Sequence, residues 1–200
     1  MAEGEIRMGH PDDRDRFGRF VESLRAKFAA APDIQDVPPR EPEDGPVLAL
    51  VYADVPEPGF VTGFTYGLSP FRRANAQTPA RELCITMRST DPEWARVPAL
   101  TVAALRGLCP FASGMVIGYK KPYVPPSDLS SLVLASTPPS LALARPVDVT
   151  TPGADTQDLI EIVGAYPVYP SERTAVRADG LGVLFDSTGD PYDPGRQAVV

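Results

Sequence analysis

The sequence is poor in histidine and cysteine, and each shortage excludes a class of functional site. Its single histidine, His10, lies in a polar N-terminal stretch that precedes any hydrophobic core pattern. A nucleophile–histidine–acid triad needs an imidazole beside the nucleophile, and most zinc sites use at least one histidine. The 2 cysteines are too few for a four-thiolate metal site. We therefore expect no metal, no cofactor and no histidine-dependent catalysis.

Positive charge is also scarce in this chain. There are 19 basic residues against 26 acidic ones, which leaves a net charge of −7 at pH 7. A protein of this charge is repelled by phosphate backbones and by anionic lipid headgroups. We therefore expect neither a nucleic-acid partner nor a membrane partner, and an acidic surface of this kind suits a basic protein partner.

Long hydrophobic runs are absent as well. The longest apolar stretch, residues 97–108, contains Arg106 and falls short of the ~20 residues that cross a bilayer. The N-terminal stretch MAEGEIRMGHPDDRDR has no apolar segment of the kind that signal peptides carry. These features predict a cytoplasmic protein, in which Cys84 and Cys109 are reduced thiols rather than a disulfide.

Proline, in contrast, is abundant, with 24 among 200 residues, whereas its usual share is ~5%. Proline limits the length of helices, so a helical bundle is excluded. Prolines and acidic residues are concentrated in residues 31–46, APDIQDVPPREPEDGP. Such a segment can neither continue a helix nor join the interior of a sheet, and it predicts an exposed, extended connector.

An amphipathic helix is predicted before this connector, over residues 12–30. Five apolar residues recur there at helical spacing: Phe17, Phe20, Val21, Leu24 and Phe28. We expect this stripe to pack on the protein's own core, as in most amphipathic helices of globular proteins, and docking onto a partner is the alternative. The predicted organisation is an N-terminal helix plus acidic proline-rich connector over residues 1–46, followed by the main domain over residues 47–196.

Several runs of strand length follow the connector. They are rich in β-branched and aromatic residues or alternate apolar with polar ones. These runs span residues 47–54, 60–68, 81–89, 114–119, 131–136 and 159–166. Strands and helices mix without strict alternation. The pattern therefore predicts an α/β (α+β) fold with a mixed, largely antiparallel β-sheet flanked by helices.

Two helices are predicted within the main domain. Asp91 caps the first, Trp94 packs from it onto the sheet, and Pro98 divides it in two. The second helix opens near Glu172 and ends at Gly180, where a left-handed residue can close the last turn. A short apolar segment follows this helix, and we expect a disordered tail after it.

Paired carboxylates are the one catalytic option that this composition leaves. Five of them lie in or beside predicted elements: Glu82, Asp91, Glu93, Glu161 and Glu172. Two carboxylates on facing strands could form an acid–base pair, but no spacing selects such a pair. A carboxylate at the start of a helix also has a structural explanation. A small carboxylate-dependent enzyme is therefore the weaker interpretation.

One loop is a candidate for binding a partner. Lys120, Lys121 and Tyr123 lie in a proline-rich segment directly after a predicted strand. They form a local positive region with an aromatic residue, and aromatic residues are common anchors in protein interfaces. The alternative is a solvated loop, and the same two interpretations apply to the basic pair at residues 72–73.

Several short motifs follow one another in a recognisable order. They are Thr65-Tyr66-Gly67-Leu68-Ser69, Glu82-Leu83-Cys84-Ile85, Pro92 with Trp94, Gly114 to Gly118, Ile160-Glu161-Ile162, and Asp193 with Arg196. This order resembles the Suppressor-of-fused (SUFU) domain family, in the bacterial form that lacks the second domain of the animal protein. The resemblance covers residues 47–196, which is the predicted main domain.

The resemblance implies a mixed sheet flanked by helices and a role in binding other proteins rather than in catalysis. In this family the animal member sequesters transcription factors, and bacterial members are often regarded as immunity proteins of polymorphic toxin systems. The family offers no catalytic residues to carry over. Five residues therefore transfer only as fold markers: Tyr66, Gly67, Glu82, Trp94 and Glu172. The resemblance therefore favours an immunity protein that neutralises a toxin, and a regulatory or scaffolding adaptor is the alternative.

Overall fold

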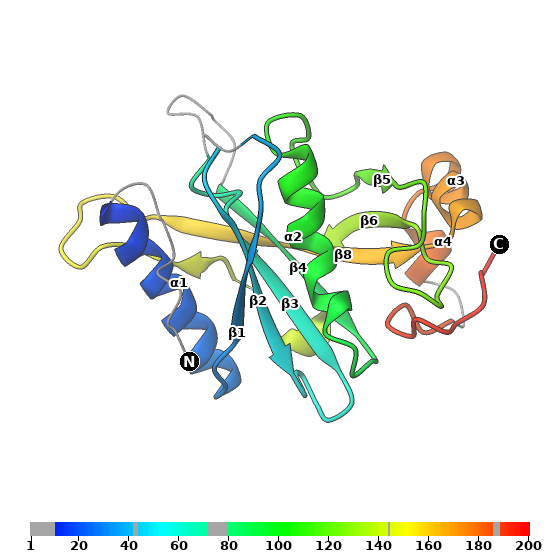
Figure 1. Ribbon diagram of the computed structural model, residues 1–200, viewed down its shortest axis with the longest axis horizontal. Coiled ribbons are helices and arrows are strands. Elements are labelled where there is room, and N and C mark those ends of the chain that lie inside the picture. The colour runs from blue at the N-terminus through cyan, green and yellow to red at the C-terminus, as the bar shows by residue number, and fades with distance from the viewer. Residues whose placement is uncertain (1–10, 42–43, 72–79, 144, 186–188) are drawn as a thin grey trace.

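One eight-stranded sheet forms the centre of the computed structural model, which describes residues 11–41, 44–71, 80–143, 145–185 and 189–200 (Figure 1). The strands lie in the order β1-β2-β3-β4-β8-β6-β5, and β7 pairs with β8. Their bounds are β1 Asp33–Val37, β2 Val47–Ala53, β3 Val61–Tyr66, β4 Ala80–Met87, β5 Val116–Gly118, β6 Ser131–Ser136, β7 Val147–Asp148 and β8 Leu159–Val168. All neighbours are antiparallel except β4 and β8. The predicted fold class is confirmed.

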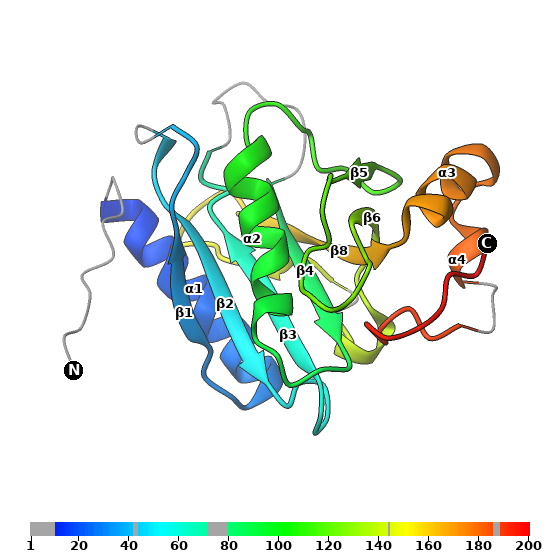
Figure 2. The same ribbon diagram turned by 45° about the vertical axis from the view of Figure 1, so that its right-hand side comes forward.

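Helices cover both faces of this sheet. Their bounds are α1 Pro11–Phe28, α2 Glu93–Leu105, α3 Pro170–Asp179 and α4 Gly182–Phe185, and a 3-10 helix, η2, spans Pro139–Leu141. Helix α1 lies on one face of β2 and β3 and α2 on the other (Figure 2). Helices α3 and α4 lie together at the far end, beyond β5 and β6 (Figure 1). Within the described part of the chain, no helix has the length and apolar character that crossing a bilayer would need.

The strands β2, β3 and β4 are buried on both sides, and their sequences reflect this. Side chains alternate between the two faces along a strand. Leu48 and Leu50 of β2 belong to the core beneath α1, whereas Val47 and Ala49 belong to the core beneath α2. A strand covered on both faces needs consecutive apolar residues. The run VLALVYA in β2 supplies them.

Helix α1 packs on the protein's own core, as its periodicity predicts. Phe20 and Leu24 are both completely buried. Phe28 adds ring contacts with Tyr52 at 5.6 Å and with Phe64 at 5.7 Å between centroids. The aromatic stripe therefore covers one face of the sheet, and it is not available for docking a partner.

Helix α2 covers the opposite face and approaches the sheet closely. The Asp91 side chain accepts a hydrogen bond from the backbone N–H of Glu93 at 3.0 Å, as the sequence predicts, and Trp94 is 2% exposed. A Cβ on Gly63 of β3 would lie 2.0 Å from the carbonyl oxygen of Ala95. Only glycine at position 63 permits this approach of helix and strand.

The prediction that Pro98 divides this helix is wrong. Helix α2 continues through Pro98 and ends at Leu105. Proline removes one backbone hydrogen bond and strains the preceding turn. The helix nevertheless stays continuous, because buried residues on both sides of Pro98, among them Val97 and Ala99, hold it against the sheet.

The predicted exposed connector also differs from the structure. Asp33–Val37 forms β1, which pairs with β2 and is the edge strand of the sheet. The segment DIQDV contains no proline, so each of its residues can donate a backbone hydrogen bond. Its charged residues suit an edge strand, where they discourage pairing with another sheet. The division of the chain at residue 46 stays a prediction.

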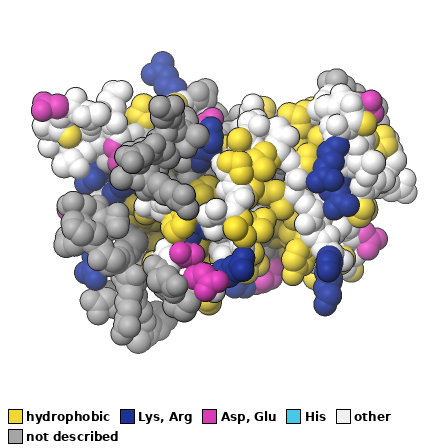
Figure 3. Space-filling view, turned by 90° about the horizontal axis from the view of Figure 1, so that it is seen from above, with side chains coloured by type: hydrophobic (Ala, Val, Ile, Leu, Met, Phe, Trp, Pro, Cys, Tyr) yellow, Lys and Arg dark blue, Asp and Glu magenta, His cyan; other side chains and the backbone are white. Residues whose placement is uncertain are grey.

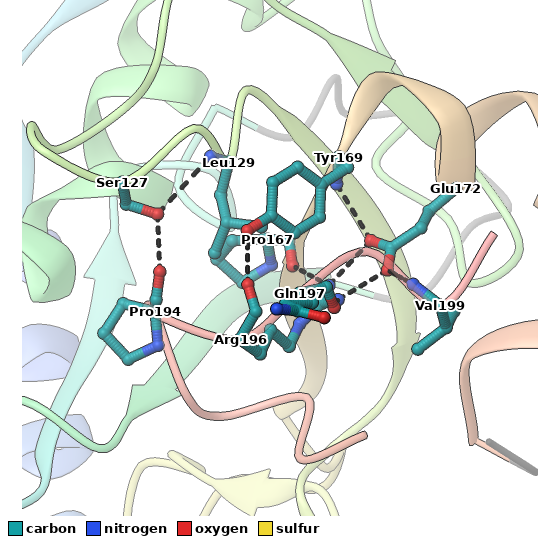
Figure 4. Close-up of polar contacts among 9 residues, drawn as sticks. All are labelled: Ser127, Leu129, Pro167, Tyr169, Glu172, Pro194, Arg196, Gln197 and Val199. Carbon is teal, nitrogen blue, oxygen red and sulfur yellow. Dashed lines mark hydrogen bonds and ion pairs between the residues drawn. The ribbon is translucent and has the colours of Figure 1, made fainter. Parts of the chain in front are cut away.

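The C-terminal tail is ordered rather than disordered over residues 189–200. Ser127 donates a hydrogen bond to the carbonyl oxygen of Pro194 at 2.7 Å, and the Tyr169 hydroxyl donates to that of Arg196 (Figure 4). These contacts join the tail to the loop before β6 and to the start of α3. The prediction of a disordered tail is therefore wrong for these residues. The tail is held by hydrogen bonds to particular residues, and its sequence has no hydrophobic pattern from which packing could be predicted.

Replacing Trp94 with alanine should lower the free energy of unfolding by about 3–5 kcal/mol, because a large buried side chain leaves a cavity. Chemical denaturation followed by circular dichroism measures this change. Leu100→Ala is the matched control, since Leu100 lies on the same helix and is 46% exposed. An unchanged denaturation midpoint for Trp94→Ala would contradict the core position of this side chain.

Deleting residues 1–46 should leave an aggregating or molten body, because Leu50 and Phe64 lose the cover that α1 provides and β2 becomes an open edge. Size-exclusion chromatography and binding of a hydrophobic dye would detect this. In the full-length chain, Phe20→Ala should be destabilising, whereas Arg25→Ala on the exposed side of α1 should not. A soluble, cooperatively folding 47–200 fragment would instead support the division at residue 46.

Candidate functional site

The carboxylates considered for acid–base catalysis each have a structural partner. Asp91 caps α2, and Glu93 forms an ion pair with Arg96 at 2.8 Å. Glu161 on β8 forms an ion pair with Arg81 on β4 at 2.7 Å. The two remaining candidates, at positions 82 and 172, are completely buried. The structure brings none of the five together as an acid–base pair.

Glu82 on β4 organises the turn that follows β3. Its carboxylate accepts hydrogen bonds from the Thr65 hydroxyl at 2.5 Å and from the backbone N–H groups of Gly67 at 3.0 Å and Ser69 at 2.8 Å. A further N–H from Leu68 lies at 3.2 Å. Consecutive backbone N–H groups of this kind stabilise a buried negative charge. Glu82 therefore holds the turn in place and has no free oxygen for catalysis.

A buried ion pair connects α3 to the C-terminal tail (Figure 4). Glu172 accepts hydrogen bonds from Arg196 at 2.5 and 2.7 Å and from the backbone N–H groups of Tyr169 at 2.9 Å and Val199 at 3.0 Å. Burial alone would raise the pKa of Glu172. The hydrogen bonds from Arg196, Val199 and Tyr169 outweigh burial, so this pKa lies below its ordinary value.

The cysteines are free thiols, and burial makes both of them less acidic. Burial raises the pKa of the fully buried Cys84, and it also raises the pKa of the half-buried Cys109. A raised pKa leaves little thiolate, so neither residue resembles a reactive nucleophile. Among the residues that the structure describes, no group of histidine, cysteine and acidic side chains could hold a metal ion. His10 and the basic pair at residues 72–73 lie outside the described residues.

The loop after β5 contains the three residues proposed from the sequence, and two of them face solvent. Lys120 and Lys121 are exposed, and Tyr123 is half-buried against the core beneath α2. The loop is held at both ends, because Tyr119 donates its backbone N–H to Ser130 at 2.8 Å and Tyr123 donates to Leu129 at 3.0 Å. These hydrogen bonds join the loop to the segment that precedes β6.

A stacked tyrosine pair is the main feature of this loop. The rings of Tyr119 and Tyr123 lie 5.9 Å apart at an angle of 13°. Tyr119 is 60% exposed, whereas burial raises the pKa of Tyr123 well above its ordinary value. One ring therefore anchors the loop and the other is displayed on it. We call Tyr119, Lys120, Lys121 and Tyr123 the tyrosine–lysine surface.

Two arginines of α3 adjoin this surface and were missed by sequence reasoning. Arg177 donates to the carbonyl oxygen of Val116 at 3.4 Å, and a Cβ on Gly118 would lie 1.9 Å from a terminal nitrogen of Arg173. Both side chains therefore reach β5 from the neighbouring helix. Their spacing of four residues places them on one side of α3, but nothing in the sequence indicates which element that side meets.

No family model and no curated protein matches the sequence. Among solved structures, a SUFU (suppressor of fused protein) homologue from Neisseria gonorrhoeae matches 94% of this chain and 98% of its own, with a TM-score of 0.62 and 14% sequence identity. The Sufu-Fu complex crystal structure matches over 91% of each chain, with a TM-score of 0.62 and 15% identity.

Drosophila Suppressor of Fused also matches, with a TM-score of 0.59 and 16% identity, over 92% of this chain and 51% of that chain. The chain thus spans about half the length of the Drosophila protein and nearly all of the bacterial one. The SUFU-like fold that the order of motifs predicts is confirmed.

Replacing Arg196 with alanine should lower the free energy of unfolding by about 3–5 kcal/mol, because Glu172 would remain buried without a counter-charge. Urea denaturation measures this loss. Arg88→Ala is the control, since Arg88 forms an exposed ion pair with Asp190 that contributes less than about 1 kcal/mol. An equal loss from both variants would contradict a special role for the buried pair.

The same ion pair predicts a pH dependence with a definite sign. The pKa of Glu172 is lower in the folded protein, so its stabilisation is present above its unfolded pKa of about 4.3 and is lost as the pH falls through the folded pKa. In Arg196→Ala, this loss of stability on acidification should disappear or reverse, which urea midpoints between about pH 7 and pH 3 would reveal.

Proposed function

We propose that this protein binds another protein through the tyrosine–lysine surface. The observation that carries the proposal is the stacked pair of Tyr119 and Tyr123, of which one ring is 60% exposed on a loop held by backbone hydrogen bonds. An exposed aromatic ring on a preorganised loop loses little conformational entropy on binding. Tyrosine is also among the residues that contribute most to protein interfaces.

The similarity to SUFU structures supports a binding role. One of the matching structures is the Sufu-Fu complex, in which that protein is bound to a partner. An enzymatic role would need a free pair of ionisable groups, whereas each carboxylate considered for catalysis already has a structural partner. A non-enzymatic protein-binding domain is therefore the function that the described residues support best.

Within this role, we favour an immunity protein that binds and neutralises the toxin of a bacterial polymorphic toxin system in the cytoplasm. The support is the match over nearly the full length of a bacterial SUFU homologue, compared with half of the Drosophila protein. A protein that acts through one tight complex needs no cofactor and no metal.

The net charge of −7 favours encounter with a basic toxin domain. Exposed acidic residues without an ion pair among the described residues include Asp33 and Asp36 of β1, and Asp148 and Asp155 near the loop before β8. These elements lie at the end of the molecule opposite β5 and α3 (Figure 1). The net charge of the whole molecule would therefore attract a basic partner over a long distance, and the tyrosine–lysine surface would make the close contacts with it.

A partner captured from native lysate and identified by mass spectrometry provides the test. Tyr119→Ala should weaken this complex by about tenfold or more, the usual loss for an aromatic hot spot. Lys27→Ala, an exposed lysine on α1 far from the loop, is the control and should leave the affinity unchanged. Full affinity of Tyr119→Ala would remove the tyrosine–lysine surface from the interface.

Rate constants for the same pair test the charge of the partner. For a basic toxin, association should slow steeply as salt rises from low to near-physiological concentration, because ions screen charges beyond about 8–10 Å. Dissociation should change less, since short-range contacts hold the complex. An association rate that ignores salt would argue against a basic partner and would leave the binding role intact.

A further inference from the structure

Four cationic side chains gather at one corner of the molecule. Lys120 and Lys121 follow β5 in the chain, and Arg173 and Arg177 reach β5 from α3. Arg173 lies against Gly118, which directly precedes Tyr119 in the chain. Figure 3 shows Lys and Arg side chains collected next to a band of hydrophobic side chains, at the end of that face where β5 and α3 lie.

Ion pairs set most other described arginines apart from these four cations, whereas the exposed Lys27 resembles them in having none among the described residues. Most other arginines on the described elements form ion pairs, as Arg16 does with Asp158, Arg81 with Glu161, Arg88 with Asp190, Arg96 with Glu93 and Arg196 with Glu172. None of the four cations forms an ion pair with any residue that the structure describes. The four cations therefore form a local positive group among the described residues, although the chain as a whole carries −7.

Arg173 is half-buried and held in position, and the exposed Arg177 is tethered by one hydrogen bond. Arg173 lies against the backbone at Gly118, and its Nε is buried without an acceptor among the described residues. Arg177 donates to the backbone of β5, the last strand on that side of the sheet. A planar guanidinium that is fixed in this way needs little ordering before it binds a carboxylate with two parallel hydrogen bonds.

We infer that the tyrosine–lysine surface, together with Arg173 and Arg177, binds an acidic segment of the protein partner. Carboxylates of this segment pair with the four cations, and an apolar side chain of the segment packs on Tyr119. The inference rests on the proposed function and specifies the chemistry of the partner at that surface. A toxin domain that is basic overall can present such a segment, because the net charge affects the rate of association whereas local charges affect the contacts within the complex.

A protein segment suits this corner better than a nucleic acid. Cations beside aromatic rings also bind single-stranded nucleic acids, through phosphate contacts and base stacking. A nucleic acid carries negative charge along its whole length, however, and the acidic remainder of this protein would repel the parts outside the corner. A short acidic segment within a protein experiences the local field of the corner and much less of this repulsion.

Fluorescence anisotropy of the full-length protein with three labelled probes tests the inference. The first probe is a peptide of about 12 residues in which Glu alternates with Leu and Tyr, the second replaces every Glu with Gln, and the third is an oligothymidylate of equal length. We expect the Glu peptide to bind at least about tenfold more tightly than the Gln peptide, and its affinity to fall as salt rises. The oligothymidylate should bind more weakly than the Glu peptide.

Charge reversal locates the binding site. Lys120→Glu with Lys121→Glu should lower the affinity for the Glu peptide by about tenfold or more and leave the chemical-denaturation midpoint unchanged, since both side chains are exposed. Lys27→Glu with Arg25→Glu is the matched control, because it reverses the same number of exposed positive charges on α1, away from the loop. Equal losses from the two charge reversals would indicate only the change in net charge and would overturn the inference.

The remaining outcomes separate this inference from the proposed function. If the Glu and Gln peptides bind equally and Tyr119→Ala weakens both, the surface binds protein without selecting for acid, so the inference fails and the proposed function stands. If neither peptide binds, but Tyr119→Ala still weakens binding of the partner captured from lysate, the inference also fails and the proposed function stands. If the oligothymidylate binds most tightly, both the inference and the proposed function are wrong.

Discussion

Burial of both faces of the central strands is the constraint on which the rest of this structure depends. A strand that is covered on two sides must be apolar at consecutive positions, and each of its faces must find a helix. Helix α1 supplies one cover and α2 the other, although they lie far apart in the sequence. The order of strands leaves β1 and β5 at the two edges of the sheet. Because α1 and α2 cover the faces of the central strands, a partner can contact only the edges of the sheet, the loops or the outer sides of the helices.

Buried charge follows from the same constraint. The turn after β3 and the C-terminal tail contain polar backbone groups, and two fully buried carboxylates accept hydrogen bonds from them. These are Glu82 of β4 and Glu172 at the start of α3. A buried carboxylate is tolerable only when hydrogen bonds replace its hydration. Each therefore uses its oxygens to hold the chain in place. The acidic residues nearest the core are consequently the ones least able to perform acid–base chemistry.

The sequence predicts those elements whose stability comes from apolar burial. Hydrophobic spacing in the sequence predicted the central strands, the aromatic stripe of α1 and the buried position of Trp94. Edge strand β1 could not be predicted, because its stability comes from hydrogen bonds to β2 rather than from its own acidic sequence. The ordered tail was missed for a similar reason, since Arg196 becomes a packing residue only opposite Glu172. At the candidate site, Lys120, Lys121 and Tyr123 could be proposed because they lie close together in the sequence. Arg173 and Arg177 of α3 could not, because only the folded structure brings them to β5.

The distribution of charge then connects the fold to its proposed role. Strands β1 and β5 are at opposite edges of the sheet, so Asp33 and Asp36 on β1 are separated from the cations near β5 by the width of the sheet. At physiological ionic strength, charges separated by more than about 8 Å are largely screened, so a partner in contact with β5 experiences the local cations and only weakly the net −7. The total charge and the contact surface can therefore select for different features of one protein partner, because the net charge affects the rate of encounter and the local cations affect the contacts of the complex.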